Sequence, residues 1–135
     1  MAAQIDNLKN HIHFYFFFLI SITVPAKLKM SPLLQEGMTQ QRGDKIRVRI
    51  PISGCPAPKI TWIKDGEVME MNERIEITVS DNCANLLIHD SEKTDAGKYE
   101  LRVENEFGSD SCVFYVTLTG KYSTLFAYDI THSKK

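Results

Sequence analysis

Apolar and polar residues alternate along most of the chain from residue 45 to residue 118. A period of two puts successive side chains on opposite faces, which is typical of half-buried β-strands and not of amphipathic helices. The clearest alternation predicts strands at 45–52, 59–64, 73–79, 83–89 and 98–104, followed by a last strand that ends near residue 118. Weaker strands are predicted at 27–30, 37–41 and 67–71. The pattern therefore predicts an all-β fold.

One face of each strongly alternating strand is apolar, and these faces define the expected core. Its members are Ile46, Val48, Ile50, Ile52, Ile60, Trp62, Ile75, Ile77, Val79, Ala84, Leu86, Ile88, Tyr99, Leu101, Val103, Cys112, Phe114, Val116 and Leu118. Because the opposite faces are polar, we expect two antiparallel sheets that enclose this core between them. Trp62, the single tryptophan, is expected at its centre.

Short segments with glycine, asparagine or aspartate separate the strands and predict turns. Asp65-Gly66 is a strong hairpin signal, and 105–108 is a second one, with Gly108 expected in a left-handed conformation. No further glycine-rich hairpin follows residues 67–71, so no additional strand is expected there. The tripeptide at 42–44, Arg-Gly-Asp, also occurs in integrin ligands, but a turn is the preferred interpretation.

The segment from Asp95 to Leu101 is the most informative stretch of the chain. Asp95 and Gly97 predict a tight turn, because aspartate bonds nearby backbone amides and glycine tolerates positive φ. Tyr99 then enters a strand, with its ring buried and its hydroxyl expected to bond a nearby backbone group. A tyrosine corner of this kind begins one strand of immunoglobulin sandwiches.

Two segments together resemble I-set immunoglobulin domains over roughly residues 37–118. The first runs from Ile50 through Gly54-Cys55-Pro56-Ala57-Pro58 to Trp62, and the second is the corner that precedes Leu101. Ile50 and Leu101 stand where the family has its two sandwich cysteines, so the resemblance implies a sandwich without the inter-sheet disulfide. Ser91 stands where the family usually has an apolar residue, which puts the packing there in question.

The three cysteines are Cys55, Cys83 and Cys112. No pair has the spacing of metal ligands, and an odd number is a poor disulfide framework. Free thiols in a reducing compartment are the preferred interpretation. A disulfide is the alternative, since all three cysteines are expected near one end of the sandwich. Cys112 stands where the family often has alanine, which implies a small buried side chain.

The length and net charge of the chain exclude some classes of function. The 135 residues suffice for one domain, and the net charge of −1 gives no electrostatic case for nucleic acid or an anionic membrane. The four histidines are scattered, and the aspartates fall in turns. We find no nucleophile–base pair, phosphate loop or metal cluster, so we expect no enzyme, cofactor, metal or small-molecule ligand.

Both ends of the chain break the alternation. Residues 1–24 and 120–135 are expected to lie outside the domain, which is expected to occupy 25–119. The apolar run at 13–24 is shorter than an ordinary membrane span. Three interpretations stay open: translated intron sequence flanking a single exon, since codons for Gly120-Lys121-Tyr122 can contain a splice-donor consensus; a secretory signal peptide; or an anchor or genuine extension.

The family resemblance implies a function that the composition alone does not give. Intracellular I-set domains are similar to the serial modules of titin, twitchin and myosin-binding proteins. The implied role is a tension-bearing spacer and docking module of a cytoplasmic sarcomeric or cytoskeletal scaffold, whose partners are neighbouring modules and other sarcomeric proteins. The alternative is a secreted or cell-surface adhesion or receptor module, if the apolar N-terminus is a signal peptide.

Overall fold

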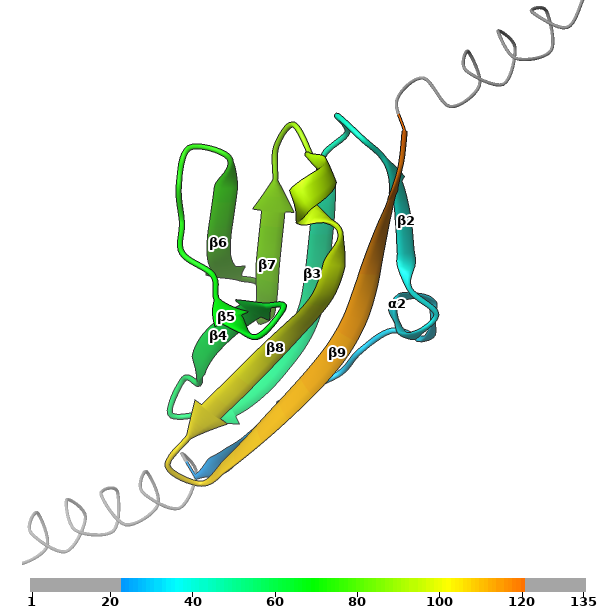
Figure 1. The fold of residues 1–135 in the computed structure, drawn as a ribbon. Helices are drawn as coiled ribbons and strands as arrows, with labels where there is room; N and C mark the ends of the chain where they lie inside the picture. Colours follow the sequence, from blue (N-terminus) through cyan, green and yellow to red (C-terminus); the bar gives the residue numbers. More distant parts are fainter. Residues whose placement is uncertain (1–22, 121–135) are drawn as a thin grey trace, which may run out of the picture.

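The computed structural model describes residues 23–120 as a sandwich of two β-sheets (Figure 1). The apolar run up to residue 22 and the tail from residue 121 lie outside the described residues. Alternation produces this architecture because each strand has one apolar face, and the two apolar faces bury each other. The predicted all-β immunoglobulin-like fold is confirmed.

The first sheet has four antiparallel strands. In spatial order they are β1 (Val24–Leu28), β3 (Ile46–Cys55), β7 (Cys83–Ile88) and β6 (Ile75–Ser80). Buried and exposed residues alternate strictly along β3 from Ile46 to Ile52. Pro51 faces outward from β3 and has no backbone N–H. The ladder to β7 does not need one at this position, because the next residue, Ile52, donates its N–H to the Asn82 carbonyl.

The second sheet has five strands. In spatial order they are β2 (Met38–Gln41), β9 (Gly108–Thr119), β8 (Gly97–Asn105), β4 (Lys59–Lys64) and β5 (Glu67–Val68). All pairs are antiparallel except β2 with β9, which run parallel. Within residues 23–120, no strand follows β5 before β6, as the sequence predicts.

The N-terminal part of the chain crosses from one sheet to the other. It pairs as β1 with β3, passes through the short helix α2 (Pro32–Gln35), and then pairs as β2 with β9. Ser31 begins α2, because its side chain accepts a hydrogen bond from the Leu34 amide at 3.3 Å. As a result, β1 begins at one end of the sandwich and β9 ends at the other (Figure 1).

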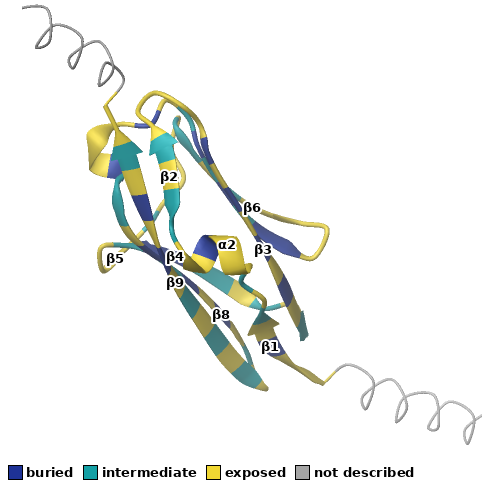
Figure 2. Ribbon diagram, turned by 90° about the vertical axis from the view of Figure 1, so that its right-hand side faces the viewer, coloured by how far each residue is buried: buried dark blue, intermediate teal, exposed yellow. Residues whose placement is uncertain are grey.

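Alternating buried and exposed bands mark the strands in Figure 2. The largest fully buried side chains are Trp62, Tyr99, Phe114, Ile46, Ile50, Leu86, Ile88, Leu101 and Val103. Phe114 connects the other two rings: it meets Trp62 edge-on, with centroids 6.3 Å apart, and stacks on Tyr99 at 5.5 Å. These rings fill the middle of the core.

Five details differ from the sequence predictions. Helix α2 was not expected, β1 begins at Val24 instead of residue 27, and β5 ends at Val68 instead of residue 71. Val79, predicted to be inward, is 55% exposed, because β6 is an edge strand. Gly108 does not have a positive φ. It is instead packed against Pro25, since a Cβ placed on Gly108 would lie 2.9 Å from the Pro25 Cβ.

Candidate functional site

The tyrosine corner joins the 3-10 turn at Lys93–Asp95 to the start of β8. Tyr99 is fully buried, and its hydroxyl donates a hydrogen bond to the carbonyl oxygen of Asp95 at 2.5 Å, as the sequence predicts. Burial, followed by the nearby Asp95 and Asp65 carboxylates, raises the pKa of the Tyr99 hydroxyl. The hydroxyl therefore stays protonated and acts as a donor inside the fold.

The Asp95 side chain connects three parts of the chain. Its Oδ2 accepts the Glu92 amide at 2.7 Å and Arg74 Nη1 at 2.9 Å, and its Oδ1 accepts Arg74 Nη2 at 3.3 Å. Arg74 also donates to the carbonyl of His89 at 3.1 Å. The hydrogen bond to Asp95 raises the pKa of the Arg74 guanidinium. Arg74 was missed in the sequence, because it carries no local signal for a partner 21 residues away.

Gly97 allows a close approach between two turns. Its φ is +143°, and a Cβ placed on it would lie 2.6 Å from Asp65 Oδ2. Asp65 Oδ1 accepts the Lys98 amide at 2.9 Å, and the Asp65 amide donates to the Lys98 carbonyl at 2.9 Å. The hydrogen bond from Lys64 lowers the pKa of the Asp65 carboxyl. The β4–β5 hairpin is thus fixed to the corner.

The predicted core residues lie between the sheets. Ile50 and Leu101 are 1% and 0% exposed and belong to opposite sheets, on β3 and β8. Trp62 lies directly opposite Leu101 in the β4–β8 register, and Leu86 is fully buried on β7. The indole Nε1 of Trp62 is buried without an acceptor among the described residues. The centre of the sandwich is therefore held by packing.

Cys55, Cys83 and Cys112 are all free thiols. Cys83 lies opposite Pro51, and Cys55, four residues further along β3, lies opposite Val24. Cys112 is half-buried opposite Leu101, and burial raises the pKa of its thiol to about 11. A neutral thiol in this position behaves as a small apolar side chain and not as a nucleophile.

Asn105 fastens the N-terminal strand, a role that the sequence did not indicate beyond its place in a hairpin. Its Oδ1 accepts the amides of Ala26 at 3.1 Å and Phe107 at 3.0 Å. Its Nδ2 donates to the carbonyls of Val24 at 2.7 Å and Pro56 at 3.1 Å. One side chain therefore joins β1, the loop after β3 and the β8–β9 turn.

Ser91 is 3% exposed, and its hydroxyl is used by the turn at residues 42–44. Gly43 donates its amide to the Ser91 hydroxyl at 3.1 Å and to the Ser91 carbonyl at 2.9 Å. The Ser91 amide donates to the Asp44 carbonyl at 3.2 Å. Packing under this loop is thus polar and hydrogen-bonded, and the tripeptide forms a fixed turn.

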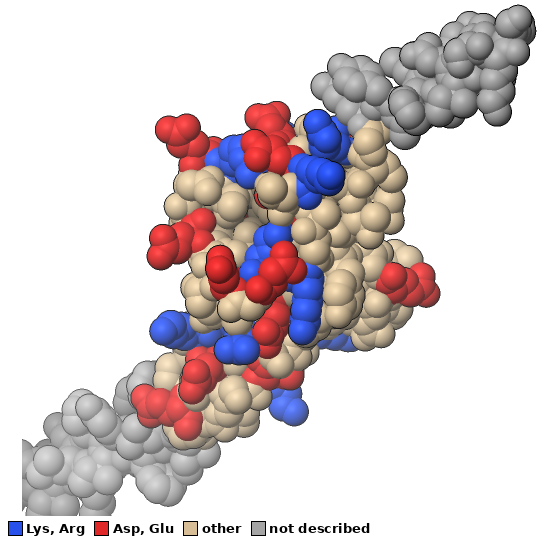
Figure 3. All heavy atoms as spheres, in the orientation of Figure 1, with Lys and Arg blue, Asp and Glu red and all other residues tan. Residues whose placement is uncertain are grey.

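Charged and metal-ligating side chains in the described part of the chain are dispersed. Residues 23–120 contain no group of three or more His, Cys, Asp or Glu that could hold a metal ion. On the face shown in Figure 3, acidic and basic side chains are interspersed. Over the same residues, no helix is long and apolar enough to span a bilayer.

The two facing sheets, the tyrosine corner and the central tryptophan define an immunoglobulin-type sandwich. The chain belongs to the immunoglobulin I-set family, since the model of the immunoglobulin I-set domain matches residues 30–118.

The relatives include proteins named for the muscle M-line and for myosin binding. Human SPEG neighbor protein is 33% identical over 91 residues, 67% of this chain and 37% of that protein. Muscle M-line assembly protein unc-89 of Caenorhabditis elegans is 36% identical over 80 residues, 58% of this chain and 1% of that one. Fast-type myosin-binding protein C of Gallus gallus is 35% identical over 75 residues, 55% and 7% respectively. The chain thus spans well under half the length of these relatives.

Solved structures of titin domains share the fold. Titin A168–A170 superposes with a TM-score of 0.67 and 29% identity, covering 71% of this chain and 34% of that one. The titin M3 domain gives a TM-score of 0.65 and 29% identity, covering 71% and 98%. Titin Z1Z2, solved in complex with telethonin, gives 0.66 and 25% identity, covering 73% and 49%.

Proposed function

We propose that this domain is a structural and protein-docking module of an intracellular scaffold, in the sarcomere or cytoskeleton. The observation that carries the proposal is the core: an I-set sandwich held between Ile50 and Leu101 by packing, without a disulfide. Family membership points to a structural module and not to an enzyme. Its relatives include proteins named for the muscle M-line and for myosin binding.

The missing bridge supports an intracellular site of action. A sandwich disulfide contributes roughly 2–5 kcal/mol, and a reducing cytosol would not maintain it. Full burial of an aliphatic side chain contributes about 1.5–3 kcal/mol, so Ile50 and Leu101 together offset most of that loss. A secreted adhesion module would gain from keeping the cysteines.

The strand order supports a tension-bearing role. The described chain begins and ends at opposite ends of the sandwich, as serial linkage requires (Figure 1). Parallel strands β2 and β9 pair over Met38–Gln41, and the Arg42 amide extends the pairing to the Thr119 carbonyl at 2.9 Å. A pull on the two ends slides these strands past each other, so their hydrogen bonds are loaded together and not one at a time.

The limits of the module are part of the proposal. The sequence predicts a domain at residues 25–119. We propose that it also includes Thr23 and Val24, since the Val24 carbonyl accepts a hydrogen bond from Asn105. The segments 1–22 and 120–135 are proposed to contribute nothing to its stability. A truncated protein of residues 23–119 should keep the melting temperature of the full chain, and a drop of many degrees would place an end within the domain.

The partners are proposed to be other protein domains: neighbouring modules and sarcomeric proteins. Localisation tests this role. A tag inserted at the endogenous locus in striated muscle should give sarcomeric striations. A tagged product found in the medium or on the cell surface would support the adhesion alternative, especially if reductant also lowered the melting temperature of the purified domain.

Single-molecule pulling tests the mechanical part separately. The Arg42→Pro variant lacks the amide that donates to Thr119 and should unfold at lower force. Arg42→Ala keeps the amide and is the matched control. Denaturant titration of both variants separates a mechanical effect from a general loss of stability. Equal unfolding forces in the two variants would contradict the proposed shear geometry.

A further inference from the structure

Between Arg47 and Arg49, the edge of β3 that faces away from β7 is not paired with a described strand, because β1 ends before it reaches these residues. On the other side of β3, Ile52 donates its amide to Asn82, so the even-numbered residues from 46 to 52 bond to β7. The odd-numbered residues therefore point their backbone groups toward β1. The Pro51 carbonyl accepts the Lys29 amide at 2.9 Å, after which the chain turns away into α2. Beyond that point no described strand pairs with β3 on this side.

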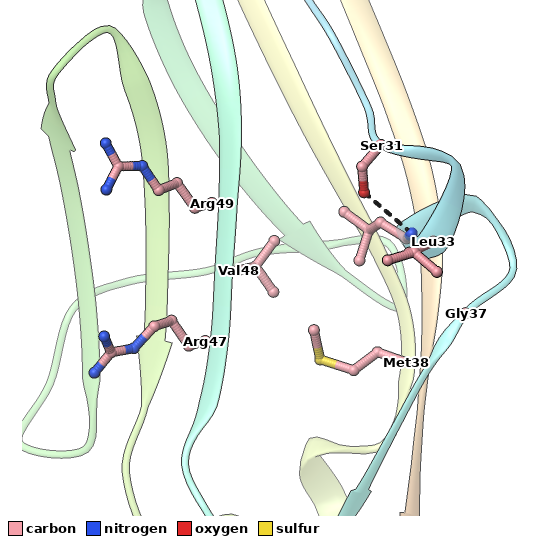
Figure 4. Close-up of a pocket in the computed structure, with 8 residues that line it drawn as sticks. Ser31, Leu33, Gly37, Met38, Arg47, Val48 and Arg49 are labelled. Atoms are coloured by element: carbon pink, nitrogen blue, oxygen red, sulfur yellow. Dashed lines mark hydrogen bonds between the residues drawn. The ribbon is translucent and has the colours of Figure 1, made fainter.

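A groove of about 320 Å³ opens beside this edge, between β3 on one side and α2 with β2 on the other. Val48 and Met38 point into it from the two sheets, and Leu33 of α2 lies at its rim (Figure 4). Leu33 is 79% exposed. The groove is thus an apolar gap between the sheets that one side chain can enter from the edge of β3.

The opposite side of the same edge is basic. Figure 4 shows the Arg47 and Arg49 side chains pointing away from the groove, over the outer surface of the sheet. All charged side chains of β1 and β3 are cations, and so are the charged residues directly beside these two strands. They are Lys27, Lys29, Lys45, Arg47 and Arg49. The acidic group paired with this row is Asp81, 3.6 Å from Arg49 and itself highly exposed. An exposed pair of this kind holds its partner weakly.

We propose that this edge binds an extended acidic peptide segment of a partner protein, which adds as a strand along β3 at Arg47 and Arg49. Successive side chains of a strand point to opposite sides. A segment that alternates apolar and acidic residues would therefore place one apolar side chain in the groove beside Val48 and Met38. Its carboxylates would face Arg47 and Arg49. Strand addition obtains affinity from backbone hydrogen bonds and selectivity from alternate side chains.

Charge argues against the other occupants. A second copy of this chain would bring its own row of cations to the same edge, and cations on an edge strand oppose pairing between like copies. The tail at 121–135 carries three lysines and one aspartate, so it has the wrong sign. Residues 1–22 carry one aspartate and one lysine, so they have no net side-chain charge to offer. The occupant that matches the edge is acidic and comes from another protein.

The test uses short synthetic peptides and the full chain. A peptide that alternates glutamate and leucine should bind in the micromolar to sub-millimolar range, measured by calorimetry. NMR should show shifted backbone amides at Arg47 and Arg49 and shifted methyl signals at Leu33 and Met38. Three peptides serve as controls: the same composition with all leucines first, the alternating peptide with N-methylated backbone, and an alternating lysine–leucine peptide. Each should bind about tenfold more weakly or worse.

Charge variants test the edge itself. Arg47→Gln with Arg49→Gln should weaken binding of the alternating acidic peptide about tenfold, because both side chains are on the basic side of the edge. Lys59→Gln with Arg102→Gln removes the same charge from the outer face of the other sheet and should leave binding unchanged. Circular dichroism melts of both double variants establish that they are folded.

Several results would overturn the inference. Equal binding of the non-alternating peptide, shifts that map away from Arg47 and Arg49, or no binding at millimolar peptide would each do so. Protection of these two amides in the free full chain would assign the edge to its own terminal segment, or to a second copy if protection rises with protein concentration. The inference rests on the proposed docking role but not on the muscle assignment, so failed peptide binding beside intact sarcomeric striations would reject this edge alone.

Discussion

Tyr99 and Asp95 form the hydrogen bond that defines the tyrosine corner: the tyrosine hydroxyl donates to the Asp95 carbonyl oxygen, four residues earlier in the chain. The donor is fully buried, so the bond has no competition from water. The same Asp95 binds Arg74 through its side chain. The corner thus connects the start of β8 to the segment before β6, which belongs to the opposite sheet.

Replacing Tyr99 by phenylalanine should lower the free energy of unfolding by roughly 1 kcal/mol, because it removes one hydrogen bond and keeps the ring. Replacing Trp62 by alanine should cost about 3–5 kcal/mol, because it opens a cavity beside Phe114. Urea titration measures both. Equal costs would mean that Tyr99 contributes more than this one bond.

The Arg74–Asp95 pair should show strong coupling in a double-mutant cycle. Asp95→Ala should cost about 2–4 kcal/mol, because it removes the carboxylate that Arg74 and the Glu92 amide share in a partly buried site. Arg74→Met should cost less, because Asp95 keeps its bond to Glu92. The coupling energy should exceed about 1 kcal/mol, whereas the exposed pair of Arg102 and Glu100 should give less than that. Additive single effects at Arg74 and Asp95 would show that the pair is not coupled.

Gly97→Ala should destabilise the domain by about 2–4 kcal/mol, since alanine tolerates the positive φ poorly and its methyl group meets Asp65. The clash alone can be relieved by Asp65→Gly. In that background Gly97→Ala should therefore cost less than in the native chain, although the cost of the φ angle remains. A cost that does not change with residue 65 would mean that backbone strain is the whole effect.

Stability should fall at alkaline pH. The pKa of the Cys112 thiol is raised by burial from 9.0 to about 11, so the unfolded chain loses this proton first. The contribution is complete below pH 9.0 and is lost as the pH rises toward 11. The raised pKa of Tyr99 acts in the same direction at higher pH. Cys112→Ala should reduce the slope of unfolding free energy against pH in this window, and an unchanged slope would assign it to other groups.

The alternation of apolar and polar residues predicted the fold well, because burial in a sandwich follows this period of two wherever a second sheet covers the strand. Ile46, Val48 and Ile50 follow the pattern, since β3 is covered along its whole inner face. Val79 obeys the same period and is exposed, because β6 is the edge of its sheet and the other sheet ends in the two-residue β5, which leaves little to pack against. Periodicity identifies a face but not what covers it.

The polar part of the corner could be predicted only in part. The Tyr99 bond is local, so the sequence indicated it. The bonds from Arg74 to Asp95 and from Asn105 to Val24 join residues far apart in the chain, and neither end carries a distinctive local pattern. Gly108 was misread for a related reason: its small size serves a contact with Pro25, which only the folded chain reveals.

Ile50 and Leu101 stand where a disulfide would otherwise link the two sheets. The absence of that crosslink determines how far the unfolded chain can extend. A bridge between these two positions would keep the chain between them as a closed loop, even after every strand had separated. Without it, all of residues 23–120 can be drawn out, to a contour length of roughly 330 Å at about 3.4 Å per residue. With it, only about half of that length would be released. Once unfolded, the domain can therefore be extended over its whole length.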